Sequence, residues 1–270
     1  MVNLNRIDLI NHINRPEEKI SIRKVIDKME SVMNSHISTS TDFLNPHEIN
    51  LSISILNRFK DNISYKVDGG YEDSESSIIY IYPSYMYENE DDDLVLFKFD
   101  TNNKIKHGDI LGSILGLSID RGKIGDILIG EKYTYFFVKR EIANFVEINL
   151  IKVSRYNILL SREDDTSGLP KKEYDYKKII VSSFRLDNLI AKVFNLSRSK
   201  VKEMIKSELV KVNFAKETRS HLELELGDLV SLRHYGRFRI FNIEGNTKKG
   251  NFVLIVRLNK WGDIYVCCYF

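Results

Sequence analysis

With 270 residues, of which 43% are hydrophobic, the chain has the length for two or three domains and the composition of an ordinary globular protein. The formal net charge of +2 is unevenly distributed along the chain. Residues 178–270 contain 17 Lys+Arg and 9 Asp+Glu, whereas residues 1–177 contain 23 Lys+Arg and 29 Asp+Glu, so the C-terminal part is basic. No run of about 18 apolar residues is present and charges interrupt the N-terminal residues, which argues against a membrane-spanning helix and a signal peptide, so we expect a cytoplasmic protein.

The first predicted module, residues 1–85, combines helices with a β-hairpin. Residues 16–35 carry apolar side chains at helical spacing, and a second helix is predicted to begin near Pro46. The strand-like runs ISYKV and SIIYIY follow, separated by a turn that contains Gly69 and Gly70. Glycines between two β-prone runs are typical of a hairpin, so this segment is predicted to be a small α/β module.

The second predicted module, residues 86–160, begins with the acidic run ENEDDD, whose charge indicates a solvated connection. Its elements alternate as β-α-β-β-α-β, the ferredoxin-like order that RNA-recognition motifs also use. They are predicted at residues 94–99, 106–115, 125–129, 133–138, 140–148 and 151–161. The run YTYFFV places Tyr133, Tyr135 and Phe137 on one face, where an RNA-recognition motif carries stacking rings. Because the glycine-bearing signature of that motif is missing, we favour packing of these rings inside the protein.

Residues 161–178 separate this module from the C-terminal one. They are polar and charged, contain Gly168 and Pro170, and have almost no aliphatic side chains. This composition predicts an interdomain linker.

The C-terminal module, residues 179–270, is predicted to begin with two short amphipathic helices. In the first, apolar residues fall at i, i+3, i+4, i+7 and i+8: Leu186, Leu189, Ile190, Val193 and Phe194. Ser197 is predicted to cap the second helix, whose core positions are Val201, Met204 and Ile205. Alternating runs then predict strands at 209–212, 222–226 and 229–233. Helices on one side of a small curled sheet would complete a core, and the whole chain is predicted to be an α+β protein of three modules.

The C-terminal residues resemble the S4 RNA-binding domain. The resemblance is carried by SFRLDNLI, SRSKV, LVKVN and LELGDLVSLR, in this order over about fifty residues. Glu208 departs from the family, which usually has glycine in the turn before the V-x-V-N strand. A non-glycine residue there would adopt the turn with some strain.

Over most of its length the chain resembles the YlmH family of bacterial S4 proteins. The matching segments are GGYEDSE, LGSILGLSIDRGKIGDILI, YGRFRI and GNTKKGNF. The family often continues GGY with an Ala-Glu-Arg triplet, where this chain has Ser74, Glu75 and Ser76, so a role of that arginine is not carried over. The resemblance implies ribosome-associated quality control, with ribosomal RNA, tRNA and the large ribosomal subunit as partners. We expect a monomer.

The exposed side of the helical hairpin is the first predicted RNA-binding surface, because Arg and Lys bind phosphate oxygens and structured RNA is read largely through its shape and backbone. Its members are Arg185, Arg198, Ser199, Lys200, Lys202 and Lys206, with Lys211 and Asn213 at the edge of the hairpin that follows. The second predicted surface contains Arg233, Tyr235 and Arg237. With Arg239 these residues would alternate along one extended chain and place three guanidiniums on one side.

Two other classes of function stay open. An RNA-modifying enzyme, of the pseudouridine synthase or methyltransferase type, is one, since S4 domains occur in such enzymes and Arg185-Leu186-Asp187 resembles a pseudouridine synthase catalytic triplet. That triplet lies inside an amphipathic helix without the Thr and Gly residues that usually follow it. A methyltransferase would require a glycine-rich turn after a strand, and the glycine-bearing segment 112–116 lies instead in a helix-like stretch. The other is a scaffold linked to cell division or to the ribosome. The six histidines are scattered, so we expect neither a metal site nor a cofactor nor a catalytic constellation.

Overall fold

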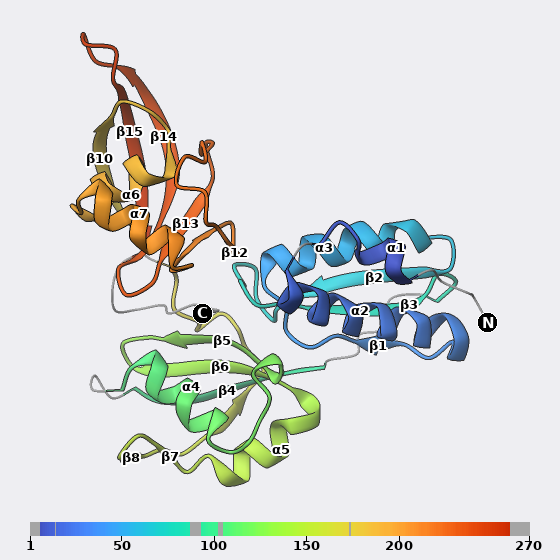
Figure 1. Cartoon of the computed structure of the whole chain (residues 1–270). Coiled ribbons are helices and arrows are strands. Elements are labelled where there is room, and N and C mark those ends of the chain that lie inside the picture. Colours follow the sequence, from blue (N-terminus) through green and yellow to red (C-terminus); the bar gives the residue numbers. More distant parts are fainter. Residues whose placement is uncertain (1–5, 14, 87–92, 102–104, 173, 260–270) are drawn as a thin grey trace. The chain divides into compact units, whose positions relative to one another are not determined.

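The computed structural model describes residues 6–13, 15–86, 93–101, 105–172 and 174–259. Within them the chain divides after Pro170 into two compact units, each described here by itself. Three separate hydrophobic clusters are present, two in the first unit and one in the second. These cores confirm an α+β protein of three modules, whose elements are labelled in Figure 1.

The first module packs two longer helices against a three-stranded antiparallel sheet of order β1-β3-β2. Its elements are α1 (Arg6–Ile10), α2 (Pro16–Ser35), β1 (Thr39–Ser40), α3 (Pro46–Leu56), η1 (Asn57–Phe59), β2 (Ile63–Asp68) and β3 (Ile78–Pro83). The predicted helices and the strand pair are confirmed, whereas α1 was not predicted. The connection between the strands is longer than a tight turn, since Asp68 lies opposite Ile78.

The second module has the predicted order of elements: β4 (Leu94–Asp100), α4 (His107–Leu115), η2 (Arg121–Lys123), β5 (Ile124–Ile129), β6 (Tyr133–Lys139), α5 (Arg140–Asn149), β7 (Lys152–Val153), β8 (Tyr156–Asn157) and β9 (Ser161–Glu163). The antiparallel sheet has the order β5-β6-β4-β9, which is the ferredoxin-like arrangement. The last predicted strand, 151–161, is instead the small β7–β8 hairpin followed by β9. Ser154 turns the chain between β7 and β8 with a positive φ of 54°. Most of the acidic run ENEDDD, 88–92, lies outside the described residues.

The two faces of this sheet are both covered. Phe136 and Val138 are fully buried beside α4 and α5. On the opposite face, Phe137 is 2% exposed and stacks on Tyr71 of the first module, with ring centroids 5.6 Å apart and planes 9° apart. Tyr135, on the same face, is also buried. The favoured interpretation of the YTYFFV aromatics, packing rather than an open stacking platform, is confirmed for Tyr135, Phe136 and Phe137, whereas Tyr133 is only half-buried.

Asp126 of β5 makes hydrogen bonds to the first module beside Phe137. Its buried carboxylate accepts hydrogen bonds from the Tyr71 hydroxyl (2.8 Å) and from the backbone N–H groups of Glu75 (2.8 Å) and Ser76 (3.0 Å). Burial, together with the charge and hydrogen bond of Asp126, raises the pKa of Tyr71. Gly70, with φ +86°, allows the close approach, because a Cβ there would lie 2.3 Å from the Phe137 ring.

The C-terminal unit is a six-stranded antiparallel sheet of order β10-β15-β14-β13-β11-β12 with two helices on one face, as Figure 1 shows. Its elements are β10 (Tyr174–Val181), α6 (Leu186–Phe194), α7 (Arg198–Lys206), β11 (Val210–Val212), β12 (Ala215–Lys216), β13 (Leu229–Leu232), β14 (Gly236–Asn246) and β15 (Phe252–Asn259). The predicted helices and their apolar faces are confirmed, and the Ser197 hydroxyl caps α7 by accepting from the Lys200 N–H.

Two stretches differ from the sequence predictions. Strands β9 and β10 lie at the two ends of the expected linker 161–178, because each finds its pairing partner on a distant strand, β4 and β15. The predicted strand 222–226 was wrong. That segment makes an isolated bridge between Glu223 and Arg185, and the Leu224 N–H donates to the Phe184 carbonyl, so its extended backbone pairs with the chain before α6 instead of joining the sheet.

Glu208 adopts the backbone conformation that the usual glycine would favour. Its φ is 58°, and the Glu208 N–H donates to the Ile205 carbonyl as α7 ends. The Lys216 ammonium lies 3.1 Å from the Glu208 carboxylate. The S4 turn is therefore formed by a non-glycine residue in the left-handed region.

Candidate nucleic-acid interface

The helical hairpin α6–α7 buries one side and leaves its cations on the other. Leu186, Leu189 and Ile190 of α6 are fully buried, as are Val201 and Ile205 of α7. The cations of α7 are exposed: Arg198, Lys200, Lys202 and Lys206. Because residues four apart follow one another along a helix face, 198, 202 and 206 form a single cationic ridge.

Asp187 organises the base of this ridge. Its carboxylate is 0% exposed and accepts from both the Arg185 guanidinium, at 3.2 and 3.3 Å, and the Arg198 guanidinium, at 2.9 and 3.1 Å. The Lys202 ammonium lies 3.9 Å from the same carboxylate. One buried anion thus holds three of the predicted RNA-binding side chains side by side.

The electrostatics of Asp187 follow from this contact set. Burial alone raises the pKa of a carboxyl group, but here the hydrogen bonds from Arg185 and Arg198 outweigh burial and lower the pKa of Asp187. The same pairing raises the pKa of Arg185. The side chains keep exposed fractions of 36% for Arg185 and 51% for Arg198, so a phosphate can still reach both residues.

Lys200 and Ser199 lie on the same hairpin but away from Asp187. The Lys200 ammonium donates to the Tyr235 hydroxyl at 3.1 Å and lies 5.7 Å from its ring centroid. The Tyr235 ring in turn packs 6.0 Å from that of Phe194. The Ser199 hydroxyl is 3.2 Å from the hydroxyl of Ser197. Tyr235 thereby joins the helical surface, whereas the sequence assigned it to the second one.

Asn213, one of the predicted RNA-binding residues, makes hydrogen bonds within the C-terminal unit. It begins the turn between β11 and β12 with φ 48°. Its side-chain amide donates to the Asp228 carboxylate at 2.8 Å, and its carbonyl accepts from the Leu229 N–H at 3.0 Å. These bonds tie the β11–β12 turn to the start of β13.

The predicted alternation of Arg233, Arg237 and Arg239 along one extended chain was wrong. Residues 233–235 form a turn between β13 and β14, with His234 at φ 68°, so Arg233 belongs to that turn. Arg237 and Arg239 do share one face of β14. Arg237 is 9% exposed, with its guanidinium carbon 5.7 Å from the Phe214 ring centroid, and Arg239 donates to the Gly227 carbonyl at 2.6 Å.

The sheet places several predicted residues opposite the helices. Because directly opposed residues of antiparallel strands point to the same face, the pair Arg237–Ser231 and the pair Lys211–Ser231 put Arg237 and Lys211 on one face. Phe238 and Val230, their neighbours along the strands, are buried under the helices on the other face. The two predicted surfaces therefore lie on opposite sides of the sheet, and Lys211 lies on the face that carries Arg237. The sequence predictions did not include Arg257 and Lys178, which also lie on the face of the sheet opposite the helices. They reach this face because β10 pairs with β15, more than sixty residues later in the chain.

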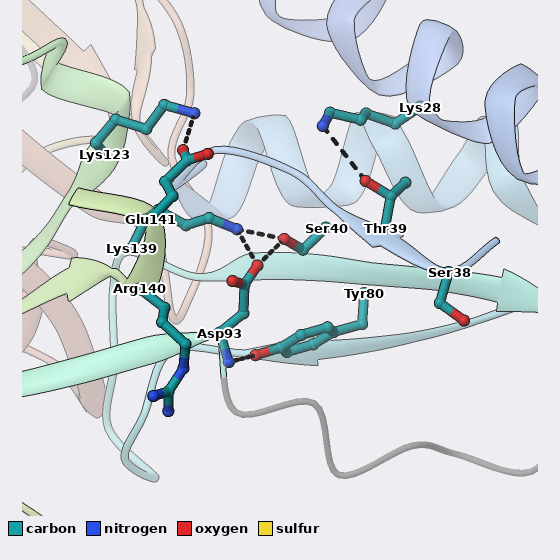
Figure 2. A pocket seen from close by; sticks show the side chains of 10 residues that line it. All are labelled: Lys28, Ser38, Thr39, Ser40, Tyr80, Asp93, Lys123, Lys139, Arg140 and Glu141. Atoms are coloured by element: carbon teal, nitrogen blue, oxygen red, sulfur yellow. Dashed lines mark hydrogen bonds and ion pairs between the residues drawn. The ribbon is translucent and has the colours of Figure 1, made fainter. Parts of the chain in front are cut away.

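The first unit contains a polar pocket of about 500 Å³ between its two modules. Figure 2 shows Lys139 pointing to Ser40 and Asp93, Lys28 to Thr39, and Lys123 to Glu141. The Lys139 side chain is nearly buried, and burial lowers its pKa against the opposing effect of Asp93. These lysines already have partners within the pocket, which leaves less reason to assign it an anionic ligand.

Among the described residues, His, Cys, Asp and Glu form no group of three or more that could hold a metal ion. The helices described for this chain include none that is long and apolar enough to cross a bilayer. The Asp187 carboxylate, in the triplet that resembles a catalytic sequence, is enclosed by guanidiniums.

Comparison with known proteins gives matches along most of the chain. Three family models match it in succession: "YlmH, N-terminal" at 17–86, "Putative RNA-binding domain in YlmH" at 88–167 and "S4 domain" at 184–230. Ribosome-associated protein quality control protein P2 of Bacillus subtilis (strain 168) is 29% identical over 248 residues, which cover 90% of this chain and 95% of that protein. The solved structure of cell division protein ylmH from Streptococcus pneumoniae has a similar fold, with a TM-score of 0.51 and 23% identity, over 58% of this chain and 97% of the solved one.

Proposed function

Since the chain belongs to the YlmH family of S4-domain RNA-binding proteins, we propose that it binds ribosomal RNA and tRNA on the large ribosomal subunit and acts in ribosome-associated quality control. It would do so in the cytoplasm, as a monomer and without a cofactor. The relative from Bacillus subtilis carries the name of a quality control protein, which supports this role.

The observation that carries the proposal is the cationic ridge of α7. Arg198, Lys202 and Lys206 succeed one another at four-residue spacing, and the apolar side of the helix is fixed in a core. A rigid row of cations suits the regularly spaced phosphates of folded RNA, since RNA helices are bound mainly through shape and backbone. Arg185 extends the row from the N-terminus of α6 through the shared Asp187 carboxylate.

Asp187 explains how cations can stay close together before RNA binds. Like charges on neighbouring side chains repel, and a buried carboxylate between Arg185 and Arg198 offsets that repulsion while it fixes the guanidiniums in space. Preorganised side chains lose less entropy on binding. This contact set supports a positioning role for Asp187 and gives no support to a catalytic one.

A variant that tests the ridge must leave the contacts of Asp187 with Arg185 and Arg198 intact. Replacing Arg185 and Arg198 together would leave the Asp187 carboxylate buried without its partners, which destabilises a fold by several kcal/mol, about 3–5 in comparable cases. Lys200→Gln with Lys206→Gln removes two charges without touching Asp187. Glutamine keeps high helix propensity. Arg58→Gln with Lys60→Gln, both exposed in the first unit, is the matched control.

Crosslinking followed by sequencing of the bound RNA from cells is the decisive measurement. We expect ribosomal RNA and tRNA reads to fall in the α7 variant and to persist in the control. In vitro, the slope of log affinity for large subunits against log salt should decrease by about 1.5, from two phosphate contacts at about 0.7–0.9 each. An unchanged RNA profile and an unchanged slope would remove Lys200 and Lys206 from the interface and contradict a ridge that continues to the end of α7.

A further inference from the structure

The sheet of the C-terminal unit has a second face, on the side away from α6 and α7. On β10, Tyr176 and Lys178 lie opposite Arg257 and Ile255 of β15. Arg257 in turn lies opposite Arg239 of β14. The intervening residues of these strands point into the core under the helices. We call this second face of β10, β15 and β14 the outer face.

Large rings are exposed on the outer face. Tyr176 is 57% exposed and Phe241 49%, and their ring centroids are 5.1 Å apart in an edge-on arrangement. A register shift between Ile240 and Asn242 leaves Phe241 without a residue directly opposite on β15. Clustered exposed aromatic side chains are costly in water and mark contact surfaces more often than isolated ones do.

Guanidiniums accompany these rings. The guanidinium carbon of Arg257 lies 4.0 Å from the Tyr174 ring centroid and 5.9 Å from that of Phe241. Both distances are within the range of a cation–π interaction, which favours a guanidinium held beside these rings. The rings and the cation form one preassembled platform.

Like charges also face each other across the strands. Arg239 and Arg257 are direct partners on β14 and β15. Pairs of like charges directly opposite one another destabilise a sheet. Such pairs are tolerated most easily where an anion lies above them.

We propose that the outer face is a second RNA-binding surface, which stacks unpaired bases on Tyr176 and Phe241 and binds the adjoining phosphates with Arg239 and Arg257. Any base can stack on an aromatic ring, so this surface accepts single-stranded RNA with little sequence preference. Paired RNA keeps its bases inside the helix and cannot use the rings. The outer face therefore differs from α7 both in place and in the form of RNA that it binds.

The combination of rings with guanidiniums favours RNA over a protein as the occupant. A protein partner for exposed rings would need carboxylates placed opposite the Arg239–Arg257 pair. RNA supplies an anion at every nucleotide and a flat ring beside it, which matches the alternation of cations and rings on this face.

The test uses full-length protein and two fluorescent probes, a single-stranded oligouridine of about ten nucleotides and a fully paired, blunt-ended RNA duplex. All variants also carry Lys200→Gln and Lys206→Gln, so that α7 does not mask the outer face. Tyr176→Thr with Phe241→Thr removes the rings and keeps β propensity. Tyr176→Phe with Phe241→Tyr keeps both rings. Phe145→Ser with Ile148→Ser removes exposed apolar side chains from α5 in the first unit and serves as the control.

We expect the ring-deleted protein to bind oligouridine at least about 25-fold more weakly, because two stacked bases at about 1–3 kcal/mol each give about 2–6 kcal/mol, at tenfold per 1.4 kcal/mol. The ring-swapped and control variants should bind like their parent, and duplex binding should not change. Photocrosslinking with 4-thiouridine should map to Tyr176 or Phe241.

Equal oligouridine affinity with and without the rings would overturn the proposal, as would equal losses for oligouridine and duplex. Loss of a protein crosslink in cells with RNA binding intact would assign the face to a protein instead. None of these outcomes bears on the α7 ridge, because every variant compared carries the same two substitutions on α7.

Discussion

Two sheets in this protein carry rows of aromatic side chains and use them in opposite ways. In the second module, Phe137 and Tyr135 of β6 are almost completely buried, and Tyr71 of the first module stacks on Phe137. In the C-terminal unit, Tyr176 and Phe241 are about half exposed on the outer face. The rings are therefore buried in the second module, which has the order of elements of an RNA-recognition motif. They are exposed in the C-terminal unit, which has a different order of elements.

The two faces differ in the charged groups that lie beside their aromatic rings. The covered face contains the Asp126 carboxylate, which satisfies two backbone N–H groups of the segment after Gly70 and so binds a neighbouring module. The outer face carries Arg239 and Arg257, which attract anions. In both sheets a strand with several aromatic residues offers a contact surface. We infer that the charged groups beside the rings select the partner: a carboxylate favours backbone N–H groups of the same protein, and guanidiniums favour an anionic molecule.

Phe137→Ala gives the largest expected effect. Removing a ring that is 2% exposed leaves a cavity between the first two modules, at a cost of about 3–5 kcal/mol. Hydrogen exchange should increase in residues 69–77 and along β6, and the denaturation midpoint should fall. Phe145→Ala, from an exposed position on α5, is the control and should have little effect. Unchanged exchange in 69–77 would mean that the ring does not hold this segment.

Asp126→Ala should have the next largest effect. It leaves the Tyr71 hydroxyl and the N–H groups of Glu75 and Ser76 without their acceptor in a buried place, at a total cost of about 2–4 kcal/mol. Tyr71→Phe removes one of the three hydrogen bonds and should cost about 1 kcal/mol. Chemical denaturation monitored in the first unit measures both. If the two variants lose equal stability, the backbone hydrogen bonds contribute nothing and the comparison of the sheets loses its electrostatic basis.

Tyr176→Thr should have the smallest effect on stability. The ring is 57% exposed, so its replacement by another β-forming residue should change the free energy of unfolding by no more than about 0.5 kcal/mol. Thermal unfolding of the full-length chain checks this. A loss as large as that of Phe137→Ala would show that the outer face is part of a core and would end the contrast.

Much of the local structure was predictable. The helix at 16–35, the cap at Ser197 and the apolar faces of α6 and α7 follow from periodicities that each segment carries within itself. The β-α-β-β-α-β order of the second module was predicted in the same way. The strand expected at 222–226 was wrong because alternation permits an extended chain but does not supply a strand to pair with.

The exposed cations of the helical hairpin were predictable from sequence, but their arrangement was not. Sequence alone identified the cations of the helical hairpin, since a narrow apolar face on α7 leaves the remaining positions to solvent. That Asp187 would lie between Arg185 and Arg198, that Tyr235 would lie beside Lys200, and that Arg257 would stand opposite Arg239 depended on contacts between segments distant in the chain. Sequence determines which side chains each segment can bury or expose. Tertiary structure decides which exposed side chains become neighbours, because strand pairing and helix packing set distances that no local pattern encodes.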